Sequence, residues 1–215
     1  MLSIPSDYSD QQARLERARI VATAQGLYLE RGVGQVSLAD VAFVLRIPIA
    51  AVERQFPEGQ PALLKLVLES HLRYIHENLQ ELSAACRNAV EALLAMRRFM
   101  QQQMSGTRSL LLPEMEALDP ALWRHTQRTR LLFMRKHLRD NLHQGMYEGL
   151  YRADLNVKDQ VRRWLREVDE KLLAAPTPTE AVELYYNHLS ELLASITTPV
   201  GAYVVRRLQE APPYY

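Results

Sequence analysis

Apolar residues along this chain recur at the three- and four-residue spacing of α-helices, and no stretch of useful length alternates as a β-strand does. Near the N-terminus, Ile20, Ala24 and Leu27 fall on one face of a helix. A longer stripe runs from Leu64 to Leu82 with the same period. The pattern predicts an all-α protein, because a half-buried strand would need alternate residues to be apolar.

Glycine and proline divide the chain into segments of helix length. A first helix ends near Gly32, and Ser37 with Asp40 has the form of a capping box that begins a second helix over 37–45. Pro48 separates that helix from a short third one over 49–55. Longer helices are expected from residue 61 and at about 87–104, 120–148, 157–174, 179–196 and 198–210. Three short helices before a long one fit a helix-turn-helix head on a larger bundle, although any small three-helix unit shows the same pattern.

Composition narrows the class of protein. The 215 residues are 47% hydrophobic and 24% charged, which suits one or two soluble globular domains. A net charge of +1 excludes a strongly basic nucleic-acid binder but leaves room for a small DNA-contacting face. The single cysteine, Cys86, allows no internal disulfide and no cysteine zinc site. Without a long apolar run or a signal-peptide pattern, we expect a cytoplasmic protein with no membrane partner.

Three segments of the N-terminal part carry a family resemblance: Arg19–Gly32, Val36–Ala42, and Phe56 followed by residues 62–64. In this order they resemble the head of the TetR family of bacterial transcriptional regulators. The stretch Gly145–Asn156 is similar to the junction of the seventh and eighth helices in many such regulators. The resemblance implies a helix-turn-helix DNA-binding domain over 14–75, and a helical domain over 76–215 that dimerises and binds a ligand.

The resemblance also gives the candidate DNA-binding residues, and several of them depart from the family pattern. Arg46 stands where a small residue is usual, Pro48 replaces a serine cap, Glu53 replaces a tyrosine, and Gln60 falls near the place of a lysine. Residues 1–70 hold seven basic and eight acidic side chains, a net charge of −1 that opposes phosphate binding. We therefore hypothesise that DNA binding is weakened, specialised or lost. The candidates are Ser37, Arg46, Pro48, Ile49, Ala50, Ala51, Glu53, Arg54, Gln55 and Gln60.

In the C-terminal domain, bulky and flexible apolar residues are candidates for lining an effector pocket, with ordinary core packing as the alternative. They are Tyr74, Met96, Phe99, Met100, Met104, Trp123, Phe133, Met134, His137 and Trp164. By resemblance, the last two helices form the dimer interface, and intramolecular packing is again the alternative. The interface candidates are Tyr185, Tyr186, Leu189, Leu193, Tyr203 and Val204.

The sequence contains no motif that indicates an enzyme or a metal site, and it contains one basic stripe. No phosphate loop, nucleophile elbow or acid–base pair points to an enzyme, and the histidines lack metal-ligand spacing, so no metal or cofactor is expected. Residues 124–139 hold six basic side chains and no acid, a stripe that fits a solvated face or an anion-binding one. The resemblance implies a small-molecule-responsive repressor that binds operator DNA as a homodimer. The alternative is a dimeric TetR-like protein with weakened or lost DNA binding that acts through a protein or small-molecule partner.

Overall fold

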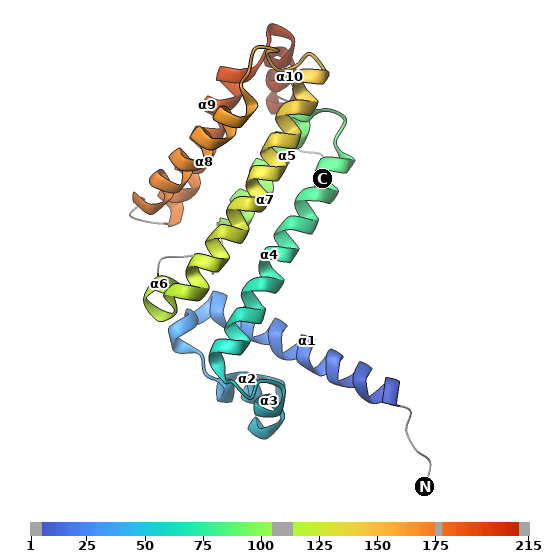
Figure 1. The fold of residues 1–215 in the computed structure, drawn as a ribbon, viewed down its shortest axis with the longest axis vertical. Helices are drawn as coiled ribbons and strands as arrows, with labels where there is room; N and C mark the ends of the chain where they lie inside the picture. Colours follow the sequence, from blue (N-terminus) through green and yellow to red (C-terminus); the bar gives the residue numbers. More distant parts are fainter. Residues whose placement is uncertain (1–5, 105–113, 175–177, 211–215) are drawn as a thin grey trace. The chain divides into compact units, whose positions relative to one another are not determined.

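The computed structural model describes residues 6–104, 114–174 and 178–210, and this part of the chain contains helices and no β-strand. The predicted all-α fold is therefore confirmed. The helices are labelled in Figure 1. One short 3-10 helix, Val33–Gln35, lies between α1 and α2. Their bounds are α1 Ser6–Arg31, α2 Leu38–Leu45, α3 Ile49–Gln55, α4 Gln60–Ala85, α5 Ala89–Met104, α6 Glu114–Leu118, α7 Pro120–Tyr147, α8 Val157–Ala174, α9 Pro178–Ile196 and α10 Pro199–Glu210.

The chain forms two compact units, and each is described by itself. The N-terminal unit comprises residues 1–72 with 107–126, and the C-terminal unit comprises 73–106 with 127–215. The expected boundary after residue 75 lies three residues from the one within α4. Sequence reasoning also placed residues 114–126 in the C-terminal domain, whereas the structure assigns them to the N-terminal unit. The physical reason is that Met115, Leu122 and Trp123 are buried in the core of that unit.

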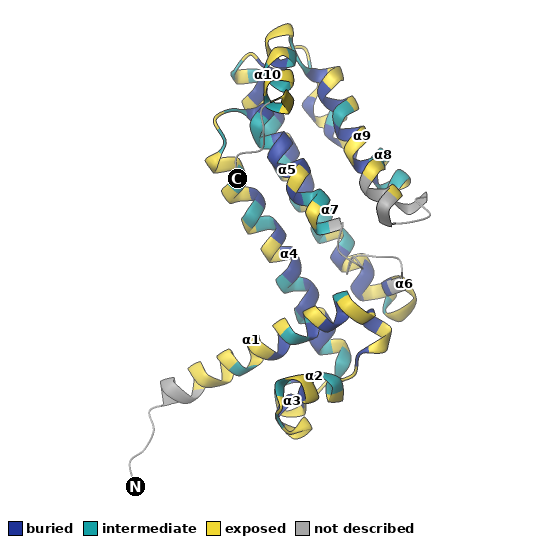
Figure 2. Ribbon diagram, turned by 180° about the vertical axis from the view of Figure 1, so that it is seen from behind, coloured by how far each residue is buried: buried dark blue, intermediate teal, exposed yellow. Residues whose placement is uncertain are grey.

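The N-terminal unit packs α1, α2, α3 and the first part of α4 around one apolar core, seen as dark blue faces in Figure 2. Ile20, Val41 and Val52 are fully buried there, one from each of the first three helices. The predicted capping box begins α2: the Ser37 hydroxyl accepts from the backbone N–H of Asp40, and the Asp40 carboxylate accepts from the N–H of Ser37. The Ser37 hydroxyl donates to the same carboxylate and lowers the pKa of Asp40.

The C-terminal unit has its own core, formed by α5, α7, α8, α9 and the second part of α4. Leu138 and Leu142 of α7, Val90 of α5, and Leu189 and Ile196 of α9 have no exposed surface. Among the described residues, no helix combines the length and the apolar character needed to cross a membrane.

The loop after α7 is fixed to the junction between α9 and α10. Tyr151 pairs with Thr197 in an isolated β-bridge, and Thr198 donates its N–H to the carbonyl of Leu150. The Thr198 hydroxyl donates between two carbonyls, 2.9 Å from that of Gly149 and 3.2 Å from that of Leu150. Gly201, in the first turn of α10, lies directly over the Leu150 carbonyl. The absence of a side chain at residue 201 permits this close approach.

Candidate DNA-binding surface and bundle core

Helices α2 and α3 form a helix-turn-helix with a turn of three residues. Arg46 ends α2 in the left-handed region (φ 56°, ψ 43°), and Ile47 donates its N–H to the carbonyl of Ala42. Pro48 precedes α3 in an extended conformation and makes no side-chain cap. The sequence departures at these two positions therefore fall at the tightest point of the motif.

The left-handed conformation of Arg46 predicts a stabilising substitution. A non-glycine residue there costs roughly 1–2 kcal/mol, partly offset by the greater unfolded-state freedom of glycine. We expect Arg46→Gly to raise the free energy of unfolding by about 1 kcal/mol, which differential scanning calorimetry would detect as a higher Tm. Arg46→Ala is the matched control, because it removes the same charge but keeps the strain. Equal Tm values for the two variants would contradict the prediction.

The structure separates the candidate DNA-binding residues into two groups. Arg46, Pro48, Ile49, Ala50, Glu53 and Arg54 are exposed, as is the capping residue Ser37. The side chains of the other three are buried or hydrogen-bonded within the N-terminal unit. Ala51 is buried, Gln55 donates to the Glu16 carboxylate, and Gln60 donates to the carbonyls of Val33 and Val36.

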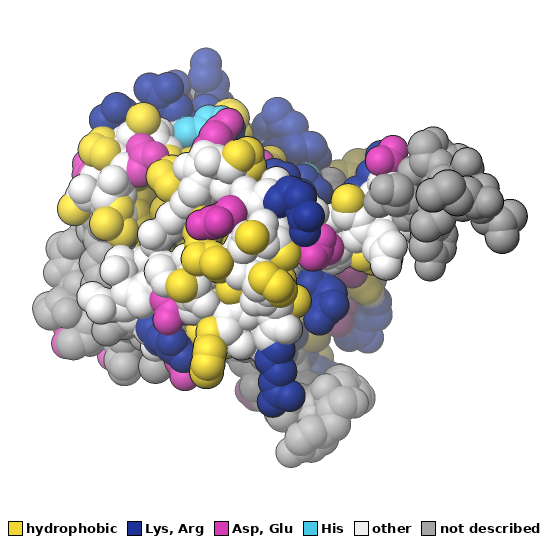
Figure 3. Space-filling model, turned by 90° about the horizontal axis from the view of Figure 1, so that it is seen from below, with side chains coloured by type: hydrophobic (Ala, Val, Ile, Leu, Met, Phe, Trp, Pro, Cys, Tyr) yellow, Lys and Arg dark blue, Asp and Glu magenta, His cyan; other side chains and the backbone are white. Residues whose placement is uncertain are grey.

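The exposed face of α2 and α3 is more apolar than sequence reasoning indicated. Phe43 is 83% exposed, Val44 48% and Ile49 44%. Figure 3 shows a face on which hydrophobic side chains lie among separate basic and acidic ones. Phe43 and Val44 were missed as surface candidates because a short helix with apolar residues all round does not reveal its outer face.

The predicted effector pocket is only partly assembled. Five of its residues lie in or against one core in the C-terminal unit: Met96, Phe99, Met100, Met134 and Trp164. Tyr74 is 47% exposed, and Trp123 belongs to the core of the N-terminal unit. Met96 and His137 line a cavity of about 20 Å³, which has room for one water molecule. The side chain of Met104 lies outside the described part, and the pocket stays a prediction.

Buried polar atoms without partners lie in this same core, and sequence reasoning missed them. Trp164 Nε1, the Tyr185 hydroxyl and Arg97 Nε make no hydrogen bond with any described residue. The Arg97 guanidinium lies 4.0 Å from the Tyr186 ring centre and donates to Ser190. Burial raises the pKa of Tyr185, so its hydroxyl remains a donor at neutral pH. Each such buried atom requires an explanation, such as a bound molecule that accepts from it.

His137 pairs with a second histidine and predicts a pH dependence of stability. His76 Nδ1 lies 3.0 Å from His137 Nε2, and burial with the neighbouring His76 and Lys136 lowers the pKa of His137 to about 4. The unfolded chain therefore binds more protons between pH 6.5 and 4, and stability falls as the pH falls through this window. Because the ring is only partly buried, solvent screening limits the effect to about 1 kcal/mol.

The measurement is the Tm of the protein and of His137→Gln from pH 7 to 4. Glutamine can still hydrogen-bond to His76 but cannot take up the proton. The difference in Tm between the two proteins should shrink toward low pH. A difference that stays constant would contradict the prediction.

The six predicted dimer residues also divide into two groups. Tyr185, Leu189 and Leu193 are at most 3% exposed, because they pack inside the core of their own chain. They are therefore unavailable to a second copy in this conformation. Tyr186 is 38% exposed and Tyr203 55%, and Val204 is partly buried against the core. Val200 is 62% exposed in the first turn of α10.

No protein-family model matches this sequence, and no curated protein matches it. Solved structures match over most of the chain. The reduced form of NemR from E. coli is 21% identical, with a TM-score of 0.69 over 86% of this chain and 98% of its own. A TetR-family regulator from Agrobacterium tumefaciens is 16% identical, with a TM-score of 0.67 over 86% and 100% of the two chains.

A third match is a putative transcriptional regulator from Saccharomonospora viridis in complex with choline, at 19% identity and a TM-score of 0.66 over 85% and 97% of the two chains. Identities this low establish the fold alone. The chain has the fold of the TetR family of transcriptional regulators.

Proposed function

We propose that the protein is a transcriptional regulator whose helix α3 enters the major groove of operator DNA. The observation that carries the proposal is the geometry of α2 and α3: a three-residue turn followed by a helix whose Ile49, Ala50 and Arg54 are exposed. Such a helix places its first residues at base edges, where apolar side chains contact thymine methyl groups and arginine pairs with guanine. Arg46 in the turn and Arg54 in α3 are exposed and supply positive charge at this surface.

The test is a fluorescence-anisotropy titration with DNA from upstream of the coding region, at several salt concentrations. We expect specific binding that is at least about 10³-fold tighter than binding to scrambled DNA at physiological salt. We also expect a shallow salt dependence, because few cations face the phosphates. Equal affinity for both DNAs would contradict operator recognition.

A second candidate function is supported by the apolar character of the same face. Phe43, Val44 and Ile49 are exposed, and Glu53, one turn after Ile49 in α3, is also exposed and repels phosphate. A surface of this kind suits a protein partner better than a nucleic acid. Absence of DNA binding at low salt, together with a loss of in vivo regulation in Phe43→Ser, would favour this alternative.

We further propose that an anionic effector binds beside Arg97 in the core of the C-terminal unit. Arg97, Trp164 and Tyr185 supply three unused donors there, and Arg130 adds a cation that is paired with Asp169 at 2.7 Å. The Saccharomonospora viridis neighbour is in complex with choline, a cation. The buried Arg97 would repel a ligand of that charge, so we infer an effector of the opposite sign.

Salicylate and its uncharged analogue salicylamide serve as probes in a thermal-shift assay. We expect salicylate to raise the Tm and salicylamide to have little effect. In Arg97→Gln the shift with salicylate should disappear. Equal shifts with both probes would contradict an anion-binding core.

We propose that the protein acts as a homodimer through Tyr186, Val200 and Tyr203, the exposed apolar residues of α9 and α10. Analytical ultracentrifugation should show a dimer that Tyr203→Glu converts to a monomer. Arg206→Glu, an exposed charge change on the same helix, is the control and should remain dimeric. Unchanged association of Tyr203→Glu would contradict this interface.

A further inference from the structure

A groove between α7 and α8, which we call the α7–α8 groove, is lined by cations and contains no acidic side chain. Its volume is about 490 Å³, within the range of small-molecule sites. All of its residues belong to the C-terminal unit. They are Arg135, Arg139 and His143 of α7, and Val157, Lys158, Val161 and Arg162 of α8.

The charges of the groove are only partly neutralised. Arg139 lies 2.9 Å from the Asp140 carboxylate, which Lys136 also contacts, and Arg162 lies 3.9 Å from Asp159. Arg135 and Lys158 form no ion pair with any described residue. They come from different helices and border the same groove. Two unpaired cations facing one concavity attract an anion with more than one charge.

The floor of the groove is apolar. Val157 is 8% exposed and Val161 3%, and both line the cavity. A molecule that fills the groove therefore meets an aliphatic surface below and cations along both sides. This combination suits a ligand with a charged end and a flat or apolar body.

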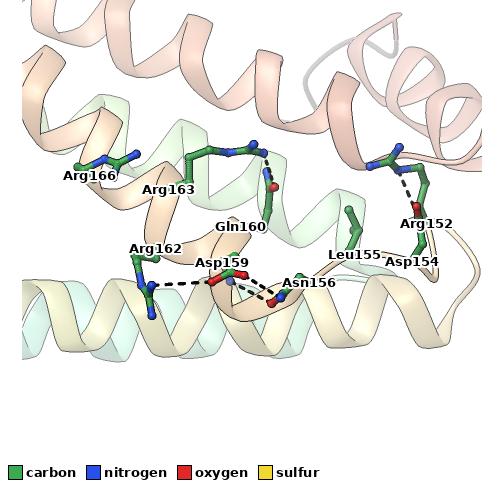
Figure 4. Close-up of a pocket in the computed structure, with 9 residues that line it drawn as sticks. All are labelled: Arg152, Asp154, Leu155, Asn156, Asp159, Gln160, Arg162, Arg163 and Arg166. Carbon is green, nitrogen blue, oxygen red and sulfur yellow. Dashed lines mark hydrogen bonds and ion pairs between the residues drawn. The ribbon is translucent and has the colours of Figure 1, made fainter.

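A neighbouring cavity provides an internal comparison. It has a volume of about 440 Å³, shares Arg162 with the α7–α8 groove, and is drawn in Figure 4. Its arginines already have partners: Arg152 with Asp154, Arg166 with Glu170, and Arg163 with the side-chain oxygen of Gln160. A high count of arginines therefore does not by itself make an anion site. The α7–α8 groove differs because no acidic side chain lines it, whereas Asp154 and Asp159 line the neighbouring cavity beside its arginines.

We propose that the α7–α8 groove binds a small molecule that carries a diphosphate group and an aromatic or apolar body, such as a nucleoside diphosphate. Arg135 and Lys158 hold the phosphate oxygens, with Arg139 and Arg162 at either side, and the body lies over Val157 and Val161. Arginine suits this role because its planar donors pair with phosphate oxygens two at a time. None of the residues that line the groove belongs to α3 or is one of the donors of the proposed effector site, so the proposal does not depend on the proposed function.

The test is isothermal titration calorimetry on the full chain with ADP, inorganic pyrophosphate and adenosine as separate probes, in buffer without divalent metal. We expect ADP to bind with a Kd on the order of 10 μM and pyrophosphate roughly tenfold more weakly, a difference of about 1.4 kcal/mol for the apolar floor. Adenosine should not bind measurably. Adenosine binding as tightly as ADP, or no binding of ADP, would overturn the proposal.

Charge-reversal variants locate the site. Arg135→Glu with Lys158→Glu should weaken ADP binding at least about tenfold, because both unpaired cations are lost. Arg73→Glu with Arg98→Glu changes the net charge equally at exposed positions outside the groove and should leave the Kd within about twofold. Should the first variant not fold, Arg135→Gln with Lys158→Gln serves the same purpose with a smaller loss.

Two further outcomes would also overturn the proposal. Equal loss of binding in both double variants would show attraction to net charge alone. A 20-nucleotide single-stranded DNA that binds the same residues more tightly than ADP would identify a nucleic-acid surface instead.

Discussion

Gly201→Ala is expected to lower the free energy of unfolding by about 3 kcal/mol, at the upper end of the usual cost of overpacking. A methyl group at residue 201 would overlap the carbonyl oxygen of Leu150, which is backbone and cannot rotate away. That oxygen accepts from the N–H of Thr198 at 2.9 Å and shares the Thr198 hydroxyl, at 3.2 Å, with the closer carbonyl of Gly149. To make room, α10 must move off the loop after α7 and stretch both hydrogen bonds.

Differential scanning calorimetry of the full chain should show a Tm about 6–12 °C lower, using 2–4 °C per kcal/mol for a chain of this size. Gly26→Ala is the control. Gly26 lies in the interior of α1, and a methyl group added there would have no atom within 4 Å, so alanine should stabilise the helix by about 0.5–1 kcal/mol. A Gly201→Ala protein that melts within about one degree of the original would refute the steric argument, because so small a change corresponds to well under about 1 kcal/mol.

The helices could be predicted from sequence because their signals are local. The apolar period, the Ser37–Asp40 capping box and Pro48 each act within a few residues. Helices α3 and α8 begin and end as expected, and α2 begins one residue later than expected, after its cap Ser37. The short helix α6 was missed, because five residues give too little period to recognise.

Which face of a helix is buried could not be predicted, because it depends on partners far away in the chain. Tyr185 and Tyr186 are neighbours with similar side chains, yet packing against the core buries the first and leaves the second 38% exposed. Trp123 is a second example. It lies in the first turn of α7 and packs in the core of the N-terminal unit, whereas α7 from residue 127 onward belongs to the C-terminal unit. Periodicity places residues on a common stripe but does not say what covers that stripe.

The sites depend on pairing, which sequence shows even less well. The basic stripe of residues 124–139 gave no indication that Arg139 has a carboxylate neighbour in the structure and Arg135 has none. Gln55 and Gln60 were candidate DNA contacts by position. In the structure the Gln55 amide donates to a carboxylate of the N-terminal unit, and the Gln60 amide donates to two backbone carbonyls of that unit. Arg46 and Arg54 are exposed in the structure, and both remain candidates for contact with DNA.

Arg54→Ala is accordingly expected to weaken operator binding by about 1–3 kcal/mol, a loss of roughly 5- to 150-fold. Arg54 is exposed in the last turn of α3, and no hydrogen bond or ion pair to another described residue holds it. Its removal should therefore leave the Tm unchanged, which separates a lost DNA contact from a folding defect. Anisotropy titrations with operator and with scrambled DNA give the two affinities.

Arg54→Lys distinguishes the two ways in which this side chain can act. If Arg54 binds a phosphate, lysine keeps the charge and most of the affinity, and alanine reduces the slope of log K against log salt by about one. If it pairs with a guanine edge, lysine loses the two-point contact, and discrimination against scrambled DNA falls with little change in salt slope. Arg98→Ala removes an equal charge from an exposed position in the C-terminal unit and should change neither quantity. Unchanged operator affinity in Arg54→Ala would mean that α3 does not present this residue to DNA, and the apolar face of Phe43 and Ile49 would then be the surface to test.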